Sequence, residues 1–241
     1  MLTTEELKRY SRQIAIFGEE GQEKLKRGRV LLAGAGGLGT PAAVYLTLAG
    51  VGFIRIVDDD VVEETNFNRQ ILHWQRDLGR PKTQSVMEKL RQMNPYADIE
   101  AFHRRIDEAS VHDLAADVDV IVDAMDNFET RYLLNRAAIA RRIPLMHGAI
   151  REFYGQATTV LPGQTACLKC IFAEGPKAGS FPVLGAVAGF IATVQATEVI
   201  KYLTGKGDLL AGRLLLWDGL RSETDSIKVG RNRRCIDCGG I

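Results

Sequence analysis

The sequence predicts a single α/β domain, and three observations support this prediction. An apolar segment, residues 29–33, is predicted to form a strand that runs into the turn Gly34-Ala-Gly-Gly-Leu-Gly39 and then into a helix over 38–48. A second apolar strand, 53–57, ends in three consecutive aspartates. The chain's cysteines form two C-x-x-C pairs. We therefore expect a Rossmann-like sheet, parallel in its amino-terminal half, with antiparallel additions in its carboxyl-terminal half and a four-cysteine zinc knuckle.

Composition bounds the organisation of the chain. Of its 241 residues, 46% are hydrophobic, which suits one large domain with a substantial core. We expect this domain, 1–241, to comprise a helical arm (1–28), a nucleotide-binding half (29–150) and a zinc-clamped half (151–241). A formal net charge of +1 argues against bulk electrostatic binding of nucleic acid. The polar start and the lack of a long apolar run predict a cytoplasmic protein with no membrane partner.

The remaining elements follow from hydrophobic periodicity and from helix signals. Residues 4–17 have apolar side chains at helical spacing, which predicts an amphipathic arm. Pro81 suits the first turn of a helix that continues through Met93. The apolar stretch 181–203 contains glycines and charged residues, so we expect a core helix. Further strands are expected over 97–102, 118–123, 144–150, 156–161 and 213–217, and further helices over 107–116 and 128–141.

The glycine turn is the candidate nucleotide site. Gly34, Gly36 and Gly39 match G-x-G-x-x-G, in which missing side chains allow backbone to approach phosphate and the helix to pack on the strand. The free N–H groups at the start of the following helix would face the anion. Asp58, at the end of the second strand, is suitably placed for a ribose hydroxyl pair. These features predict an adenine nucleotide, with NAD as the first candidate.

Two cationic side chains are candidates for phosphate contact. Arg69 lies in the polar loop 61–70 with Asn66, at the carboxyl end of a predicted parallel strand, where such sheets place their ligand sites. Lys82 lies in the first turn of its helix, where a cation opposes the helix dipole unless an anion is nearby. Asn66, Arg69 and Lys82 are therefore predicted to face the nucleotide.

Oxygen ligands gather after the predicted strand 118–123. Asp123, Asp126 and Asn127 would face the glycine turn, and such ligands suit Mg²⁺ bound together with substrate phosphates. Alternatively, Asp126 or Asn127 caps the helix 128–141. One residue could cap while the other binds the metal, and both interpretations stay open at this point.

The paired cysteines, Cys167 with Cys170 and Cys235 with Cys238, predict a structural zinc site. Two C-x-x-C knuckles are typical of tetrahedral Zn²⁺ held by four thiolates. Two disulfides are disfavoured in a cytoplasmic chain, and a redox motif would need only one pair. Such a site has no open coordination position, so it would tie the carboxyl end to the body without doing chemistry.

In combination, these motifs resemble the ubiquitin-activating-enzyme-like superfamily, and closely the bacterial MoeB/ThiF/HesA adenylyltransferases of molybdopterin and thiamine biosynthesis. The resemblance covers nearly the whole chain. It rests on Arg9-Tyr-Ser-Arg-Gln-Ile14, Gly34-Ala-Gly-Gly-Leu-Gly39, Asp58, Asn66-Phe-Asn-Arg-Gln70, Gly79-Arg-Pro-Lys82, Asp123-Ala-Met-Asp-Asn127 and the paired cysteines.

The resemblance implies that ATP, and not NAD, is the nucleotide. The enzyme would adenylate the carboxyl-terminal Gly-Gly carboxylate of a small ubiquitin-like sulfur carrier protein and release pyrophosphate. Arg69 and Lys82 would hold phosphates, and Asp126 would bind Mg²⁺. Arg12 would reach into the site of the neighbouring subunit of a homodimer. The implied nucleotide contacts are Gly34, Gly36, Gly37, Gly39, Asp58, Asn66, Arg69, Gln70, Lys82, Asp126 and Asn127.

One departure from the family pattern bears on the reaction. Many relatives have a cysteine between the first zinc knuckle and the long helix, but the segment 174–181 contains none. Since no other side chain there can replace that thiol, we expect the reaction to stop at the acyl-adenylate. A separate protein would then donate the sulfur.

Three alternatives remain open. A superfamily enzyme of the tRNA threonylcarbamoyladenosine dehydratase type is disfavoured by the near-neutral charge and by the zinc cysteines. A non-catalytic nucleotide-binding subunit is disfavoured by Arg69, Lys82 and Asp126, and an NAD-dependent oxidoreductase by Lys82 and the segment 66–70. The sequence does not distinguish between carriers for molybdopterin, thiamine, a siderophore or an amino acid.

Overall fold

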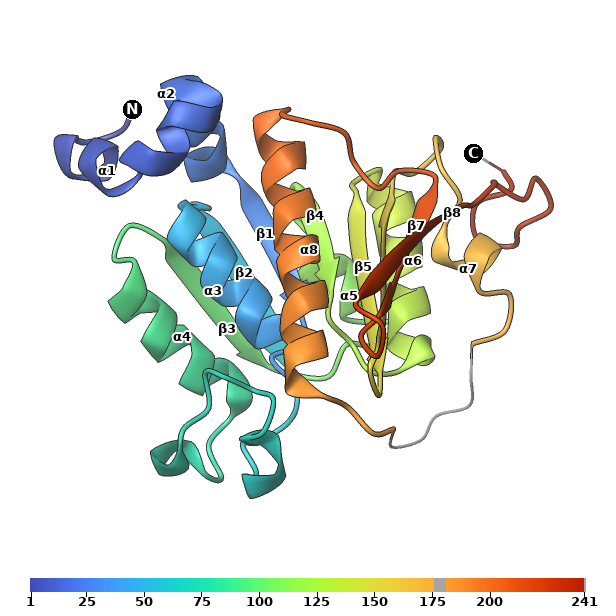
Figure 1. Cartoon of the computed structure of the whole chain (residues 1–241), viewed down its shortest axis with the longest axis horizontal. Helices are drawn as coiled ribbons and strands as arrows, with labels where there is room; N and C mark the ends of the chain where they lie inside the picture. The colour runs from blue at the N-terminus through green and yellow to red at the C-terminus, as the bar shows by residue number, and fades with distance from the viewer. Residues whose placement is uncertain (176–180, 241) are drawn as a thin grey trace.

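The computed structural model describes residues 1–175 and 181–240. Its strands are β1 (Arg29–Ala33), β2 (Phe53–Asp58), β3 (Asp98–His103), β4 (Val120–Asp123), β5 (Leu145–Arg151), β6 (Tyr154–Val160), β7 (Arg213–Asp218) and β8 (Glu223–Lys228). Within the described residues they form one sheet in the order β3-β2-β1-β4-β5-β6-β7-β8 (Figure 1). The strands from β3 to β5 are parallel, and β6, β7 and β8 add antiparallel. The predicted mixed sheet is therefore confirmed.

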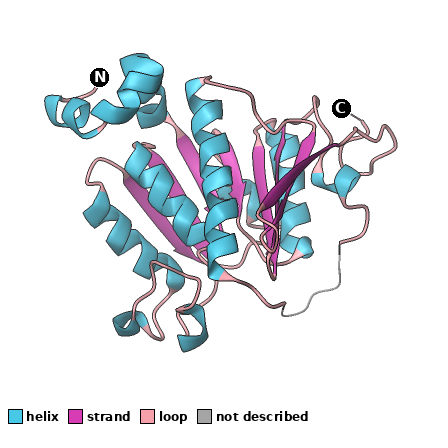
Figure 2. Ribbon diagram, in the orientation of Figure 1, coloured by secondary structure: helices cyan, strands magenta, loops and turns pink. Residues whose placement is uncertain are grey.

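Helices cover both faces of this sheet (Figure 2). They are α1 (Thr4–Arg9), α2 (Ser11–Arg27), α3 (Gly39–Ala49), α4 (Lys82–Met93), α5 (Val111–Leu114), α6 (Phe128–Arg141), α7 (Leu168–Ile171) and α8 (Gly185–Thr204), with short 3-10 turns η1 (Glu64–Asn66) and η2 (Gln75–Asp77). Helices α3, α4 and α8 lie on one face, and α5 and α6 lie on the other. No helix in the described residues has the length and apolar character needed to cross a membrane.

The apolar pattern of β1 explains this layering. Val30 and Leu32 pack into the core cluster on the α3 side, whereas Leu31 and Ala33 pack into the cluster on the α6 side. All four residues are fully buried, because successive strand side chains point to opposite faces and both faces are covered. A central parallel strand therefore needs a continuous apolar run, which this segment supplies.

Strand register places the candidate residues at one edge. Ala33, the last residue of β1, pairs with Val57 of β2 and with Asp123 of β4. Gly34 and Asp58 follow directly, so both lie at the carboxyl edge with Asp123. The strand order reverses at β1, which pairs with β2 on one side and with β4 on the other. This switch point is where open α/β sheets form a ligand crevice.

Several element boundaries differ from the predictions. The helical arm is two helices, and α2 extends to Arg27 past a break at Gly18, whose φ is 74°. The long core helix begins at Gly185 and not at 181, because the segment before it bridges to Glu152: the Glu152 N–H donates to the Pro182 carbonyl, and the Leu184 N–H donates to the Glu152 carbonyl. Between 107 and 116, the α-helix is limited to α5.

Strand β8 was not predicted: the last strand expected from the sequence was 213–217, and β8 follows it. Every residue of β8 is exposed. A strand with no buried face carries no alternation of apolar and polar residues, which is the signal that identifies strands. Short α7 was missed as well.

Candidate functional site

The glycine turn has two kinds of glycine. A Cβ on Gly34, whose φ is 102°, would lie 2.7 Å from the Ala124 carbonyl oxygen, and a Cβ on Gly39 would lie 1.9 Å from the Gly34 carbonyl oxygen. These two glycines are therefore required by the turn itself. Gly36 and Gly37 have no such clash and instead face side chains of the segment 66–70. The following helix α3 has no side-chain cap at its start, which leaves its first turn available to an anion.

Asp58 connects the turn to the end of β2. Its Oδ2 accepts a hydrogen bond from the Ala35 N–H at 2.7 Å, and its Oδ1 accepts one from the Asp60 N–H at 2.8 Å. Burial raises the pKa of this carboxyl above its ordinary value, while Lys82 and the two N–H groups act in the opposite direction. Asp58 is thus half-buried, next to the turn, with a carboxylate whose orientation is set by backbone.

Arg69 and Gln70 lie directly against the turn. A Cβ on Gly37 would be 3.4 Å from Cγ of Arg69, and one on Gly36 would be 3.6 Å from Nε2 of Gln70. Arg69 donates to the Thr65 carbonyl and to Asn68 Oδ1. Gln70 is 3% exposed, and its buried Oε1 has no hydrogen-bond partner among the described residues.

Asn66 shapes the loop that presents Arg69 and Gln70. It is 5% exposed, and its Oδ1 accepts from the Glu63 N–H at 2.9 Å. Its carbonyl oxygen accepts from the N–H groups of Arg69 and Gln70. The side-chain oxygen of Asn66 is therefore used to fold the loop.

Lys82 lies in the first turn of α4, as predicted, and Pro81 is the N-cap residue that precedes it. Its ammonium Nζ forms an ion pair with Asp60 Oδ2 at 2.6 Å, and the residue is 5% exposed. A bridge between Val61 and Pro81 brings this helix start to the end of β2. Lys82 thus lies beside residues 58–60, and the more exposed carboxylate of Asp60 neutralises its charge.

The polar residues after β4 have different roles. Asn127 is the N-cap of α6, and its Oδ1 accepts from the Thr130 N–H at 2.9 Å. Asp126 is exposed, and its only side-chain bond in the described structure comes from Asn127 Nδ2 at 3.3 Å. Asp123 is fully buried and is not an open ligand. Asn127 therefore caps the helix, and the exposed carboxylate of Asp126 remains available to a metal ion.

Sequence analysis missed the partners of Asp123. Its Oδ2 accepts from Nδ1 of His147 at 2.7 Å and lies 3.6 Å from Nε of Arg131. Burial lowers the pKa of His147, against the raising effect of Asp123, so the ring is neutral. Arg131 also donates to the Met125 and Gly148 carbonyls. This buried cluster links the carboxyl ends of β4 and β5. No local sequence motif predicts it.

The four cysteines converge as predicted. Their sulfur atoms all lie within 4.8 Å of one another, with distances of 3.6 Å between Cys167 and Cys235 and 3.4 Å between Cys170 and Cys238. Tetrahedral Zn²⁺ with Zn–S bonds of about 2.3 Å separates its sulfurs by about 3.8 Å, so the cluster fits that ion. Asn135 of α6 braces both knuckles, because it accepts from the Leu168 N–H and donates to Asp237.

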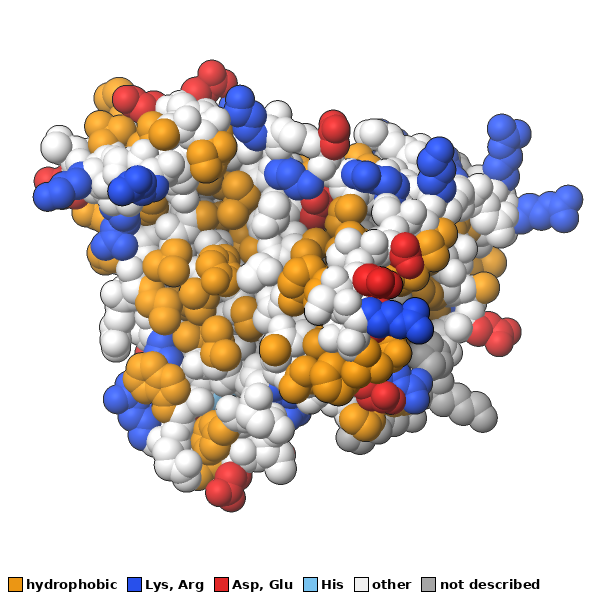
Figure 3. Space-filling view, in the orientation of Figure 1, with side chains coloured by type: hydrophobic (Ala, Val, Ile, Leu, Met, Phe, Trp, Pro, Cys, Tyr) orange, Lys and Arg blue, Asp and Glu red, His pale blue; other side chains and the backbone are white. Residues whose placement is uncertain are grey.

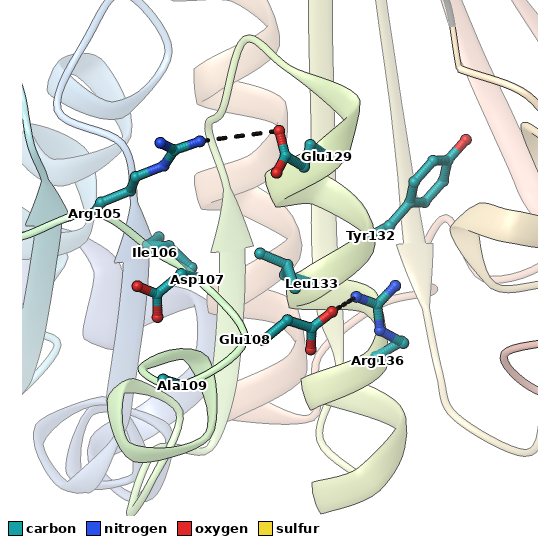
Figure 4. A pocket seen from close by; sticks show the side chains of 9 residues that line it. All are labelled: Arg105, Ile106, Asp107, Glu108, Ala109, Glu129, Tyr132, Leu133 and Arg136. Carbon is teal, nitrogen blue, oxygen red and sulfur yellow. Dashed lines mark hydrogen bonds and ion pairs between the residues drawn. The ribbon is translucent and has the colours of Figure 1, made fainter.

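Other predicted features lie elsewhere. The cysteine-free segment 174–181 falls in part outside the described residues, which omit 176–180. Arg12 is exposed on α2, away in sequence from the glycine turn. A cavity of about 650 Å³ lies between α6 and the segment after β3 (Figure 4). Its two arginines, Arg105 and Arg136, already pair with glutamates, and none of the predicted site residues lines it.

Known proteins resemble this chain in sequence over nearly its whole length. The profile of the ThiF family matches residues 10–238. The chain is 44% identical to a "SAMP-activating enzyme E1" from Haloferax volcanii, covering 99% of this chain and 91% of that protein. It is 40% identical to a "Sulfur carrier protein adenylyltransferase" from Thermus thermophilus, covering 98% and 92%.

Other similarities are more distant or cover only part of the related protein. An "Adenylyltransferase and sulfurtransferase MOCS3" from Culex quinquefasciatus is 39% identical, and the match covers 98% of this chain but 56% of that protein. The solved structure of E. coli MccB with ATP superposes with a TM-score of 0.86 at 24% identity, over 96% of this chain and 73% of that one. This last likeness establishes the fold alone.

Proposed function

The chain belongs to the ThiF family, and from this premise we propose that it adenylates the carboxyl terminus of a small sulfur carrier protein with ATP. The carboxylate attacks the α-phosphate, an acyl-adenylate forms, and pyrophosphate leaves. Two relatives at 44% and 40% identity have names that describe activation of such a carrier. The carrier ends in Gly-Gly and serves molybdopterin or thiamine biosynthesis.

The observation that carries the proposal is the placement of Arg69 and Gln70 against the side-chain-free face of the turn. Gln70 is buried there with a carbonyl oxygen that lacks a partner, and a buried unpaired acceptor costs about 1–3 kcal/mol. A bound nucleotide offers hydroxyl donors, and its magnesium offers water. Arg69 supplies positive charge at the same place, beside Gly37.

Lys82 provides the second cation. In the absence of nucleotide its charge is compensated by Asp60, whose side chain is 66% exposed. A triphosphate can replace that carboxylate because it carries more charge and Asp60 can turn to solvent. Attack of a carboxylate on a polyphosphate brings two anions together, so fixed cations at the site stabilise the transition state. Asp58 holds the ribose hydroxyls, and Asn66 orients the phosphates by shaping the loop.

Asp126 binds Mg²⁺ in this scheme. Its carboxylate is exposed at the carboxyl edge of the sheet, and the capping duty falls to Asn127. Magnesium usually takes one or two carboxylates and keeps its remaining positions for water and substrate phosphates. When bound, the ion supplies charge neutralisation between phosphates. Asn127 then contributes by fixing the position of Asp126.

Arg12 completes the site of a second copy of the chain. Gln13, the next residue, donates to the Ala49 carbonyl at the end of α3. Helix α3 has 11 residues, so this contact lies about 16 Å from the glycine turn at its start. An arginine side chain does not span that distance, which supports a role for Arg12 in the site of another subunit.

An exposed apolar surface beside the arm supports the homodimer. Ile16 of α2 is 68% exposed, and Tyr45 and Leu48 of α3 are 51% and 43% exposed. Figure 3 shows hydrophobic side chains gathered over α3. Helix α2 lies against the end of α3, where Gln13 and Gln22 donate to the Ala49 carbonyl. A second copy placed here covers the exposed apolar side chains and brings Arg12 to the partner's site.

The reaction ends at the acyl-adenylate, and a separate protein donates sulfur. All cysteines of the chain are in the zinc cluster, where they have no free coordination position. The relative whose name includes a sulfurtransferase is much longer, and this chain spans 56% of it. A thiol-labile covalent conjugate between this protein and the carrier, seen by mass spectrometry, would contradict this part of the proposal.

ATP–pyrophosphate exchange with purified carrier candidates tests the function. The wild-type protein should catalyse the exchange only when its own carrier is present. Arg69→Ala and Lys82→Ala should each reduce the exchange rate at least about 100-fold, because each removes a cation that stabilises the transition state. Lys206→Ala, an exposed lysine beyond the end of α8, is the matched control and should exchange normally. Full exchange in the Arg69 and Lys82 variants would refute the assignment.

A further inference from the structure

The peptide groups of Ala35, inside the glycine turn, are held from two sides. The Ala35 N–H donates to Asp58, as described above, and the Ala35 carbonyl accepts from Nε2 of His73 at 2.9 Å. His73 is 4% exposed. It follows the 66–70 segment in sequence and was not among the predicted site residues. A buried imidazole is thus bonded to backbone between two glycines of the nucleotide turn.

The partners of His73 define its tautomer. A carbonyl oxygen can only accept, so Nε2 carries the proton. In a neutral ring Nδ1 is then an acceptor, and the Ser85 hydroxyl donates to it at 3.0 Å. Ser85 Oγ in turn accepts from Nζ of Lys89 at 2.9 Å, and Lys89 pairs with Asp77 at 2.5 Å. The Ser85 hydroxyl has a second acceptor, the Leu72 carbonyl, at the longer distance of 3.3 Å, so its single proton is assigned to the nearer Nδ1 of His73.

The chain of bonds closes on itself through α4. Ser85 lies on the same helix as Lys82, and Lys82 pairs with Asp60. The Asp60 N–H donates to Asp58, which returns to Ala35. The glycine turn is thus connected to α4 by two routes. One runs from the Ala35 N–H through Asp58 and Asp60 to Lys82, and the other runs from the Ala35 carbonyl through His73 to Ser85.

We propose that His73 is a positioning residue for ATP: its neutral Nε2–H holds the Ala35 carbonyl and so keeps the turn's backbone N–H groups aimed at the phosphates. This inference rests on the proposed function. The groups that face the ring are Lys82 and Lys89 of α4 and Asp77 of η2. Burial, with these two lysines, lowers the pKa of His73, which keeps the ring neutral in neutral solution.

Two amide substitutions separate this role from simple packing. In His73→Gln the side-chain Nε2 can occupy nearly the place of the imidazole Nε2 and donate to Ala35, whereas the shorter amide of His73→Asn reaches only the place of Nδ1. We expect His73→Asn to weaken ATP·Mg binding, measured by calorimetry, about fivefold to tenfold, which corresponds to loss of one buried hydrogen bond. His73→Gln should remain within about twofold of wild type. Thermal midpoints of both variants report any general loss of packing.

A second variant and a second readout keep the inference testable if His73→Asn does not fold. Ser85→Ala removes the hydroxyl that orients the ring and should raise KM for ATP about threefold to fivefold while KM for the carrier stays unchanged. In the wild type, ¹⁵N NMR of the imidazole should show the neutral Nε2–H form at pH 7.

The possible outcomes separate a failure of the proposed function from a failure of the role assigned to His73. A wild-type protein that binds no ATP·Mg would refute the proposed function together with this inference. Wild-type binding with unchanged affinity in both His73→Asn and Ser85→Ala, or an Nδ1–H tautomer, would overturn the inference alone. A similar loss of affinity in the Gln and Asn variants would also overturn it, because packing and not the Nε2 donor would then be responsible.

Discussion

A composite site made from two subunits predicts a quantitative result for mixed dimers. Consider one chain with Arg12→Ala and another with Lys82→Ala. In a heterodimer, the site that uses Lys82 of the first chain receives the intact Arg12 of the second, and the other site lacks both side chains. One of two sites is complete, so the purified heterodimer should have about half of the wild-type activity per dimer.

The structural basis is the distance between the arm and the turn. Gln13 and Gln22 both donate to the Ala49 carbonyl at the end of α3, and Asn94 donates to Tyr10 and to the Thr47 carbonyl. These bonds hold the arm about 16 Å from the turn at the other end of that helix. Because an arginine side chain is shorter than this distance, we expect Arg12 to act in the partner's site.

The assay is ATP–pyrophosphate exchange on heterodimers isolated with two different affinity tags. Each homodimeric parent should show almost no exchange, and a heterodimer of wild type with Lys206→Ala should show full exchange. An isolated Arg12→Ala/Lys82→Ala heterodimer that remains as inactive as its parents would show that Arg12 does not act across subunits.

Four other predictions concern stability and metal binding. Gly39→Ala should abolish nucleotide binding because its Cβ would lie 1.9 Å from a carbonyl oxygen, whereas Gly189→Ala in α8 has no atom within 4 Å of the new Cβ and should stabilise the protein by about 0.5–1 kcal/mol in urea unfolding. Asn127→Ala should cost about 1 kcal/mol of unfolding free energy through loss of the cap, whereas Asp126→Ala should leave stability unchanged and abolish Mg²⁺-dependent exchange; equal effects of the two on stability would contradict the division of roles. Burial lowers the pKa of His147 below its ordinary value of 6.5, so as the pH falls the unfolded state binds a proton on His147 before the folded state does. The unfolding free energy should therefore be constant above about pH 6.5 and decrease below it. His147→Gln should make this decrease smaller. Cys235→Ser should reduce zinc content, measured by atomic absorption, and should make the carboxyl-terminal segment sensitive to proteolysis; full zinc content in this variant would exclude a four-thiolate site.

Much of the architecture was predictable because its signals are local. The apolar run of β1, the glycines that follow and the aspartate at the end of β2 lie within a single stretch of chain, and their spacing reports the conformation directly. The two C-x-x-C pairs predicted one common site although Cys167 and Cys235 are separated by 68 positions in sequence, because cysteine pairs have few other uses in such a chain.

Residues whose roles depend on distant partners were beyond local reasoning. His73 and Ala35 are separated by 38 positions, and His147 and Asp123 by 24. Neither histidine lies in a pattern that distinguishes a buried hydrogen-bonding residue from an exposed one. Strand β8 was missed for a different reason: all of its side chains are exposed, so its sequence has no alternation of apolar and polar residues.

By itself, then, the sequence determined where the chain turns, which segments are strands and helices of the core, and which residue types are available for phosphate and zinc. Tertiary structure decided which of these residues meet: Arg69 and Gln70 at the turn, Lys82 with Asp60, and His73 with Ala35. The physical reason is that conformation follows from neighbours along the chain, whereas hydrogen bonds, burial and charge pairing depend on packing that brings distant segments together.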